Sequence, residues 1–111
     1  MSEGAPSRPE SQESVTDAAC IEAMRNGDFE VARTWYAQNE AKADTDPSPR
    51  GRLQLTVRFA RLQFESGAVD VDTGELFAFA TLEAAREDAY QRSDDRAVGQ
   101  IDDNLREMRG A

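Results

Sequence analysis

Hydrophobic residues recur every three or four positions along most of the chain from Ser14 onward, which is the spacing of amphipathic helices. Ser14 can cap a first helix, and Gly27 can adopt the left-handed conformation that often ends one. Asp28 can then cap a second helix whose hydrophobic stripe continues to Ala43. These signals predict a helical hairpin, with its first helix over about 15–26.

The next segment is compatible with two structures. Every second residue from 53 to 59 is hydrophobic, as in a half-buried β-strand, but the same residues also fall on two neighbouring helical faces. The alternation then fails, where a strand would need a bulge. Ser48 followed by Pro49 is a helix-start signal, and Gly67 is a helix-stop signal. We therefore predict a helix over 49–66.

Segment 68–80 also leaves two structures open. Valine and aspartate alternate at its start, and a turn at Asp-Thr-Gly-Glu could complete a β-hairpin, which would make the fold α+β. Against this, Asp72 and Glu75 have the spacing of a capping box, and the residues that follow are strongly helix-forming. We predict a loop over 67–72 and a helix over 73–92, with the hairpin at 68–80 as the alternative.

The last predicted helix follows Ser93 and has one narrow hydrophobic seam. Aspartates in its first turn and arginines in its last turn match the helix dipole. The seam consists of Val98, Ile101, Leu105 and Met108. Such a seam either covers the rest of the bundle or docks on a partner, and a second copy of the chain is one candidate.

Together these elements predict an all-α fold, a small antiparallel bundle of four to five helices over residues 14–111. Residues 1–13 contain Ser, Glu, Pro and Gln with almost nothing to bury. Such a segment cannot offset the entropy lost on ordering, so we predict a disordered acidic tail before the helical domain.

The first hairpin carries a family resemblance. Gly27, Asp28, Phe29, Ala32 and Tyr36 resemble the second-helix signature of tetratricopeptide repeats. In that family, small and aromatic residues let two antiparallel helices approach closely and let neighbouring hairpins stack. No second copy of the signature follows after one repeat length of about thirty-four residues. The resemblance implies a loosely repeat-like scaffold of the kind that binds peptides or partner proteins.

Composition narrows the classes of partner. The 111 residues make one domain, with 22 acidic and 13 basic residues and a net charge of −9. This balance disfavours duplex DNA and anionic membranes as partners, because both require clustered positive charge. Lys42 is the single lysine, a usage that fits either a halophilic source or a GC-rich genome. Without a signal peptide, a long apolar run or a second cysteine, the chain is predicted to be cytoplasmic.

The residues that usually carry catalysis are few. The chain has no histidine, and its one cysteine, Cys20, lies among small apolar residues that favour a buried structural role. Neither a Gly-rich phosphate loop nor a calcium-loop spacing occurs. The clustered carboxylates are explained by helix capping and solvation. We therefore predict no cofactor, no metal and no enzymatic activity.

Basic charge concentrates in the middle of the chain. Residues 1–47 and 68–111 each sum to −6, whereas 48–67 sum to +3. Arg50, Arg58 and Arg61 lie near one face of the predicted central helix. They could receive an acidic peptide or a phosphate group, or they could pair with acidic neighbours inside the fold.

Trp35 and Tyr36 are further candidates for partner binding. Adjacent residues point about 100 degrees apart on a helix, so both cannot face one core squarely. We expect one of them to lie at a groove or a second interface.

These features favour a non-enzymatic protein-interaction or adaptor module. One alternative is an acidic regulator or inhibitor, antitoxin-like or imitating nucleic acid, whose surface covers a basic partner. A second is a small enzyme that uses carboxylates alone, which would require a concave pocket with at least two buried acids.

Overall fold

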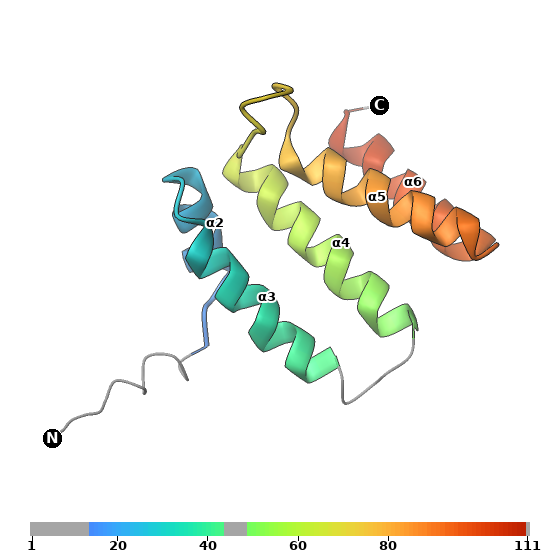
Figure 1. Cartoon of the computed structure of the whole chain (residues 1–111), viewed down its shortest axis with the longest axis horizontal. Helices are drawn as coiled ribbons and strands as arrows, with labels where there is room; N and C mark the ends of the chain where they lie inside the picture. The colour runs from blue at the N-terminus through green and yellow to red at the C-terminus, as the bar shows by residue number, and fades with distance from the viewer. Residues whose placement is uncertain (1–13, 44–48, 111) are drawn as a thin grey trace, which may run out of the picture.

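The computed structural model of the chain describes residues 14–43 and 49–110, and it confirms the all-α fold class (Figure 1). Within these residues there are helices but no β-strand. The helices are α2 (Asp17–Arg25), α3 (Phe29–Ala43), α4 (Pro49–Ser66), α5 (Phe77–Gln91) and α6 (Asp95–Met108). The tail predicted over 1–13 and the cap predicted at Ser48 lie outside the described residues.

Helix α4 is the centre of the bundle, because it contacts each of the other four helices. The hairpin of α2 and α3 covers one side of α4, and the hairpin of α5 and α6 covers the other (Figure 1). Since consecutive long helices run antiparallel, α4 and α6 run in the same direction. The first turns of α4 and α6 therefore lie at the same end of the bundle as the last turn of α5.

The central position of α4 explains its ambiguous sequence pattern. Leu55 and Leu62 belong to a core shared with α2 and α3, whereas Val57 and Ala60 belong to a second core shared with α5 and α6. A helix that is covered on two sides needs two hydrophobic faces, and two neighbouring faces create strand-like alternation over about two turns. The prediction of a helix over 49–66 is thus confirmed.

The loop before α5 corrects one boundary. Helix α5 begins at Phe77, four residues later than predicted. Residues 69 and 76 form an isolated antiparallel bridge, so the alternative hairpin is reduced to one contact without strands. Asp70 Oδ1 accepts a hydrogen bond from the Asp72 amide at 2.8 Å, and Thr73 Oγ1 accepts one from the Glu75 amide at 3.2 Å. These side chains shape the turn instead of capping the helix, because they bond to amides within the turn itself.

Two helix caps also differ from the prediction. Thr16, not Ser14, caps α2, and Asp94, not Ser93, caps α6 by accepting a hydrogen bond from the Ala97 amide at 3.2 Å. Ser93 has a φ of 58° and ends α5 in the left-handed conformation. A residue that closes one helix in this conformation cannot also provide the extended backbone of a normal cap, so the cap moves one residue on.

Candidate functional site

The aromatic pair predicted for partner binding lies largely inside the fold. Trp35 is 1% exposed, and its indole N–H donates a hydrogen bond to Asp17 Oδ1 at 2.9 Å. Its ring stacks on Phe59 with 5.7 Å between centroids, and half-buried Tyr36 meets the same ring edge-on at 5.2 Å. Both rings contact α4 because Phe59 lies between them. Trp35 therefore has no face open to a partner, so half-buried Tyr36 is the one of the two that could lie at an interface, and its role in partner binding stays a prediction.

The seam of α6 is also used within the bundle. Ile101, Leu105 and Met108 are buried in the core shared with α4 and α5, and Val98 packs against its edge. The seam thus covers the bundle, the first of the two predicted roles. These side chains are already covered within the bundle, so a second copy of the chain would have to contact other side chains of α6, and homo-oligomerisation through this helix stays a prediction.

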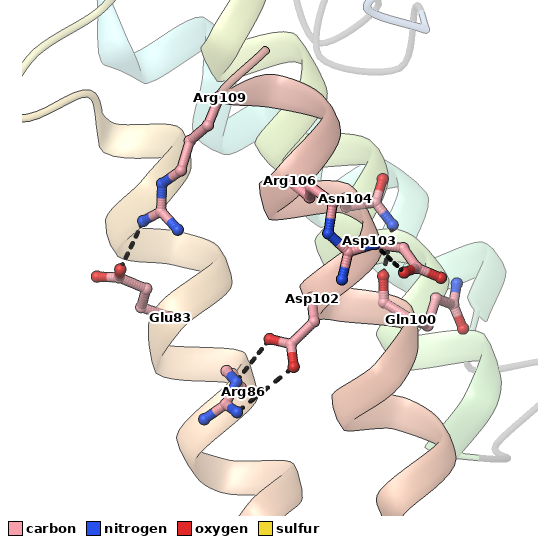
Figure 2. Close-up of polar contacts among 8 residues, drawn as sticks. All are labelled: Glu83, Arg86, Gln100, Asp102, Asp103, Asn104, Arg106 and Arg109. Carbon is pink, nitrogen blue, oxygen red and sulfur yellow. Dashed lines mark hydrogen bonds and ion pairs between the residues drawn. The ribbon is translucent and has the colours of Figure 1, made fainter. Parts of the chain in front are cut away.

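Two ion pairs at the surface join α6 to α5. Figure 2 shows Arg86 of α5 and Asp102 of α6 pointing toward each other, with Nε and Oδ1 2.6 Å apart. Arg109 reaches back to Glu83, with Nη2 and Oε2 2.9 Å apart. The hydrogen bond to Asp102 raises the pKa of Arg86 above its ordinary value. Both pairs are partly exposed, so they orient the helices more than they stabilise them.

Two of the three candidate arginines on α4 are engaged by the fold. Arg58 lies over the Trp35 ring at 5.3 Å and pairs with Asp17 at 3.8 Å. Arg61 donates two hydrogen bonds to Asn104 Oδ1, at 2.7 and 3.0 Å, and pairs with Glu107. Arg58 and Arg61 thus pair with acidic neighbours inside the fold, which is the second of the two possibilities that the sequence left open.

Arg50 lies in a different environment, a cavity of about 280 Å³ that we call the arginine cavity. The cavity lies at the end of the bundle where α4 and α6 begin and α5 ends. Its lining consists of Arg50, Leu53, Arg92, Asp94, Arg96, Ala97 and Gln100. Three arginines, one aspartate, one glutamine and two apolar residues thus line a half-open space that is near the lower size limit of small-ligand sites.

The charges of the arginine cavity are unbalanced. Arg92 pairs with Asp88 at 3.0 Å and more loosely with Asp94 at 3.9 Å. Across residues 14–43 and 49–110, neither Arg50 nor Arg96 has an ion pair or a side-chain hydrogen bond. The arginines that do pair with a carboxylate are Arg25, Arg33, Arg52, Arg58, Arg61, Arg86, Arg92, Arg106 and Arg109. Asp88 and Asp94 thus balance Arg92, whereas the positive charges of Arg50 and Arg96 have no carboxylate partner in the described part of the chain.

Arg92 and Arg96 were not predicted as site residues. Both flank the turn between α5 and α6, more than forty positions from Arg50 in the chain. Arg92 directly follows α5, where the helix dipole favours a base, so its charge needs no ligand to explain it. Arg96 lies in the first turn of α6, where the dipole disfavours a base, and that placement was its one local signal. Only the folding of α5 and α6 onto α4 brings the three arginines together.

The opposite end of the bundle carries exposed hydrophobic side chains. These are Phe29, Phe64, Val69 and Val71, of which Val71 in the loop before α5 is 91% exposed. Phe29 contacts Phe77 edge-on at 5.7 Å. Exposed hydrophobic residues of this kind are ordinary on protein surfaces, so they are weaker indications of a site than unpaired charges.

The surroundings of Cys20 and of the carboxylates bear on nucleophilic catalysis and on metal binding. Cys20 is fully buried, and burial, followed by the charge of Asp17, raises the pKa of its thiol to about 11. A thiol in this environment is a poor nucleophile at neutral pH. In the described part of the chain, every Asp and Glu is at least partly exposed, and no cluster of ligating side chains could hold a metal ion. No described helix is both long and apolar enough to cross a bilayer.

Comparison of the chain with protein-family models, with curated proteins and with solved structures gave no significant match. Any functional conclusion therefore rests on the geometry and charge of the chain itself.

Proposed function

We propose that this protein is a non-enzymatic interaction module that binds an anionic group of a partner protein in the arginine cavity. The α2–α3 hairpin, with its tetratricopeptide-like residues, would serve as part of the scaffold, and the cytoplasm is the proposed location. The main observation behind this proposal is the pair of arginines that line one cavity, Arg50 and Arg96. Neither has a carboxylate partner among the described residues, although the net charge of the chain is −9.

The charge balance makes this observation informative. An arginine in an acidic protein usually finds a carboxylate on its own surface, as Arg58 and Arg61 do. Two arginines that remain unpaired beside a third have their guanidinium groups ready for a ligand. Guanidinium groups bind carboxylate and phosphate oxygens in pairs of parallel hydrogen bonds, and clustered arginines are a common means of recognising acidic or phosphorylated motifs.

Affinity capture from a native extract tests the proposal with three baits. The first is the wild-type protein, and the second carries Arg50→Gln and Arg96→Gln. The third carries Arg33→Gln and Arg106→Gln, which lose the same charge from exposed side chains that have partners on their own helices. Capture at low and at molar salt separates ionic binding from hydrophobic binding, since salt screens the former.

The expected result is a partner retained at low salt by the wild type and the third bait and lost by the second. Its contact segment, mapped by cross-linking to the cavity, should carry acidic or phosphorylated side chains. Equal retention by the second bait would remove the arginine cavity from the interface. Capture of a basic nucleic-acid-binding protein by all three baits would instead support the acidic inhibitor.

A further inference from the structure

We infer that the arginine cavity recognises a phosphate monoester carried on a serine, threonine or tyrosine side chain of the partner. This inference rests on the proposed function and names the chemistry of the bound group. It draws on the charge of the lining, the size of the cavity and the charge of the surface around it.

The charge of the lining matches a dianion better than a single carboxylate. Arg92 already pairs with Asp88 at 3.0 Å and lies 3.9 Å from Asp94, which leaves the two positive charges of Arg50 and Arg96 without a carboxylate partner among the described residues. A phosphate monoester carries about −1.5 to −2 at pH 7, whereas a glutamate side chain carries one negative charge. A monoester would therefore give both Arg50 and Arg96 a counter-ion, while one carboxylate would neutralise only one of these two arginines.

The size of the cavity suits one compact group. About 280 Å³ accommodates a phosphate with its attached carbon, but a run of acidic side chains would have to extend onto the surrounding surface. Leu53 and Ala97 supply apolar contacts for the carbon of the ester, and Gln100 supplies an amide donor in addition to the guanidinium groups.

The surface outside the cavity disfavours extended anions. The chain has a net charge of −9, and exposed Glu87 and Asp95 belong to the helices that border the cavity. A polyanion such as nucleic acid or an acidic repeat would bring several negative charges against this surface. A ligand whose charge is concentrated at one point avoids that repulsion, because the cavity alone receives it.

Titration of the full chain with short probes tests the inference. The probes are the amidated peptide Gly-Gly-Ser-Gly-Gly, its phosphoserine form, its form with Glu in place of Ser, and glucose 6-phosphate. Nitrogen-detected NMR spectra report on the Nε–H groups of the cavity arginines and on the amides of Ala97 and Gln100. The variants carrying Arg50→Gln with Arg96→Gln and Arg33→Gln with Arg106→Gln serve as test and control.

The expected result is that the phosphoserine peptide binds at least tenfold more tightly than the glutamate peptide and at least as tightly as glucose 6-phosphate. The cavity variant should weaken phosphopeptide binding at least tenfold, and the control variant less than twofold. Circular dichroism should be unchanged, because all four substituted side chains are exposed.

The remaining outcomes separate the inference from the proposed function. Equal binding of the glutamate and phosphoserine peptides would overturn the monoester assignment and leave the interaction role standing. Binding of glucose 6-phosphate tenfold more tightly than the phosphopeptide would support the monoester chemistry on a small molecule and overturn a partner protein as its source. If no probe shifts the arginine signals, the monoester assignment falls, and the capture experiment decides the interaction role independently.

Discussion

Replacement of Trp35 by phenylalanine tests the central packing of the bundle. Trp35 is 1% exposed, stacks on Phe59 and donates its indole hydrogen bond to Asp17. The hydrogen bond to a partly exposed carboxylate contributes about 1 kcal/mol. The smaller ring buries ~40 Å² less apolar surface, which costs about 1 kcal/mol, and the space left behind adds roughly 0.5–1 kcal/mol. We expect the free energy of unfolding to fall by about 2–3 kcal/mol.

Urea unfolding followed by circular dichroism provides the measurement. With a slope of roughly 1.5 kcal/mol/M, a loss of about 2.5 kcal/mol lowers the midpoint by ~1.7 M. Circular dichroism is needed because Trp35 is the single tryptophan and its substitution removes the fluorescence signal. The matched control is Tyr36→Phe at the neighbouring half-buried position, which should change stability by less than about 0.5 kcal/mol.

A specific result would refute this reasoning. If Trp35→Phe and Tyr36→Phe both stay within about 0.5 kcal/mol of the wild type, the indole is not enclosed between α2 and α4. In that case Trp35 would return to the set of candidate partner-binding residues.

Two further predictions concern the core. Ile101→Ala should lower the free energy of unfolding by about 3 kcal/mol, because the side chain is fully buried. Val98→Ala, at the edge of the same seam, should lower it by about 1 kcal/mol. If urea unfolding showed similarly small losses for both variants, the seam would lie at the surface. For Cys20, a thiol pKa raised from 9.0 to about 11 means that the unfolded thiol ionises first as pH rises. Stability should therefore be full below pH 9 and fall by roughly 2–3 kcal/mol between pH 9 and 11, relative to the same titration of Cys20→Ala. Parallel pH profiles of the two proteins would contradict the burial of the thiol.

Local signals in the sequence predicted most helix positions. Gly27 has the left-handed φ of 84° expected after the first helix, and Asp28 accepts a hydrogen bond from the Glu30 amide at 3.2 Å as a cap. Such signals act within one turn of the chain, so they can be recognised without knowledge of the fold. The errors of a few residues occur where two short-range solutions compete, as at Ser93 and Asp94.

The sequence by itself determined that this chain forms helices, roughly where they begin and end, and that α4 carries two hydrophobic faces, because periodicity and capping depend on residues a few positions apart. Only the tertiary structure decided what those faces contact. It buried Trp35 and the seam of α6, paired Arg58 and Arg61 internally, and left Arg50 beside arginines from the turn between α5 and α6. Exposure and pairing depend on side chains that arrive from distant segments, and no spacing along the chain encodes that proximity.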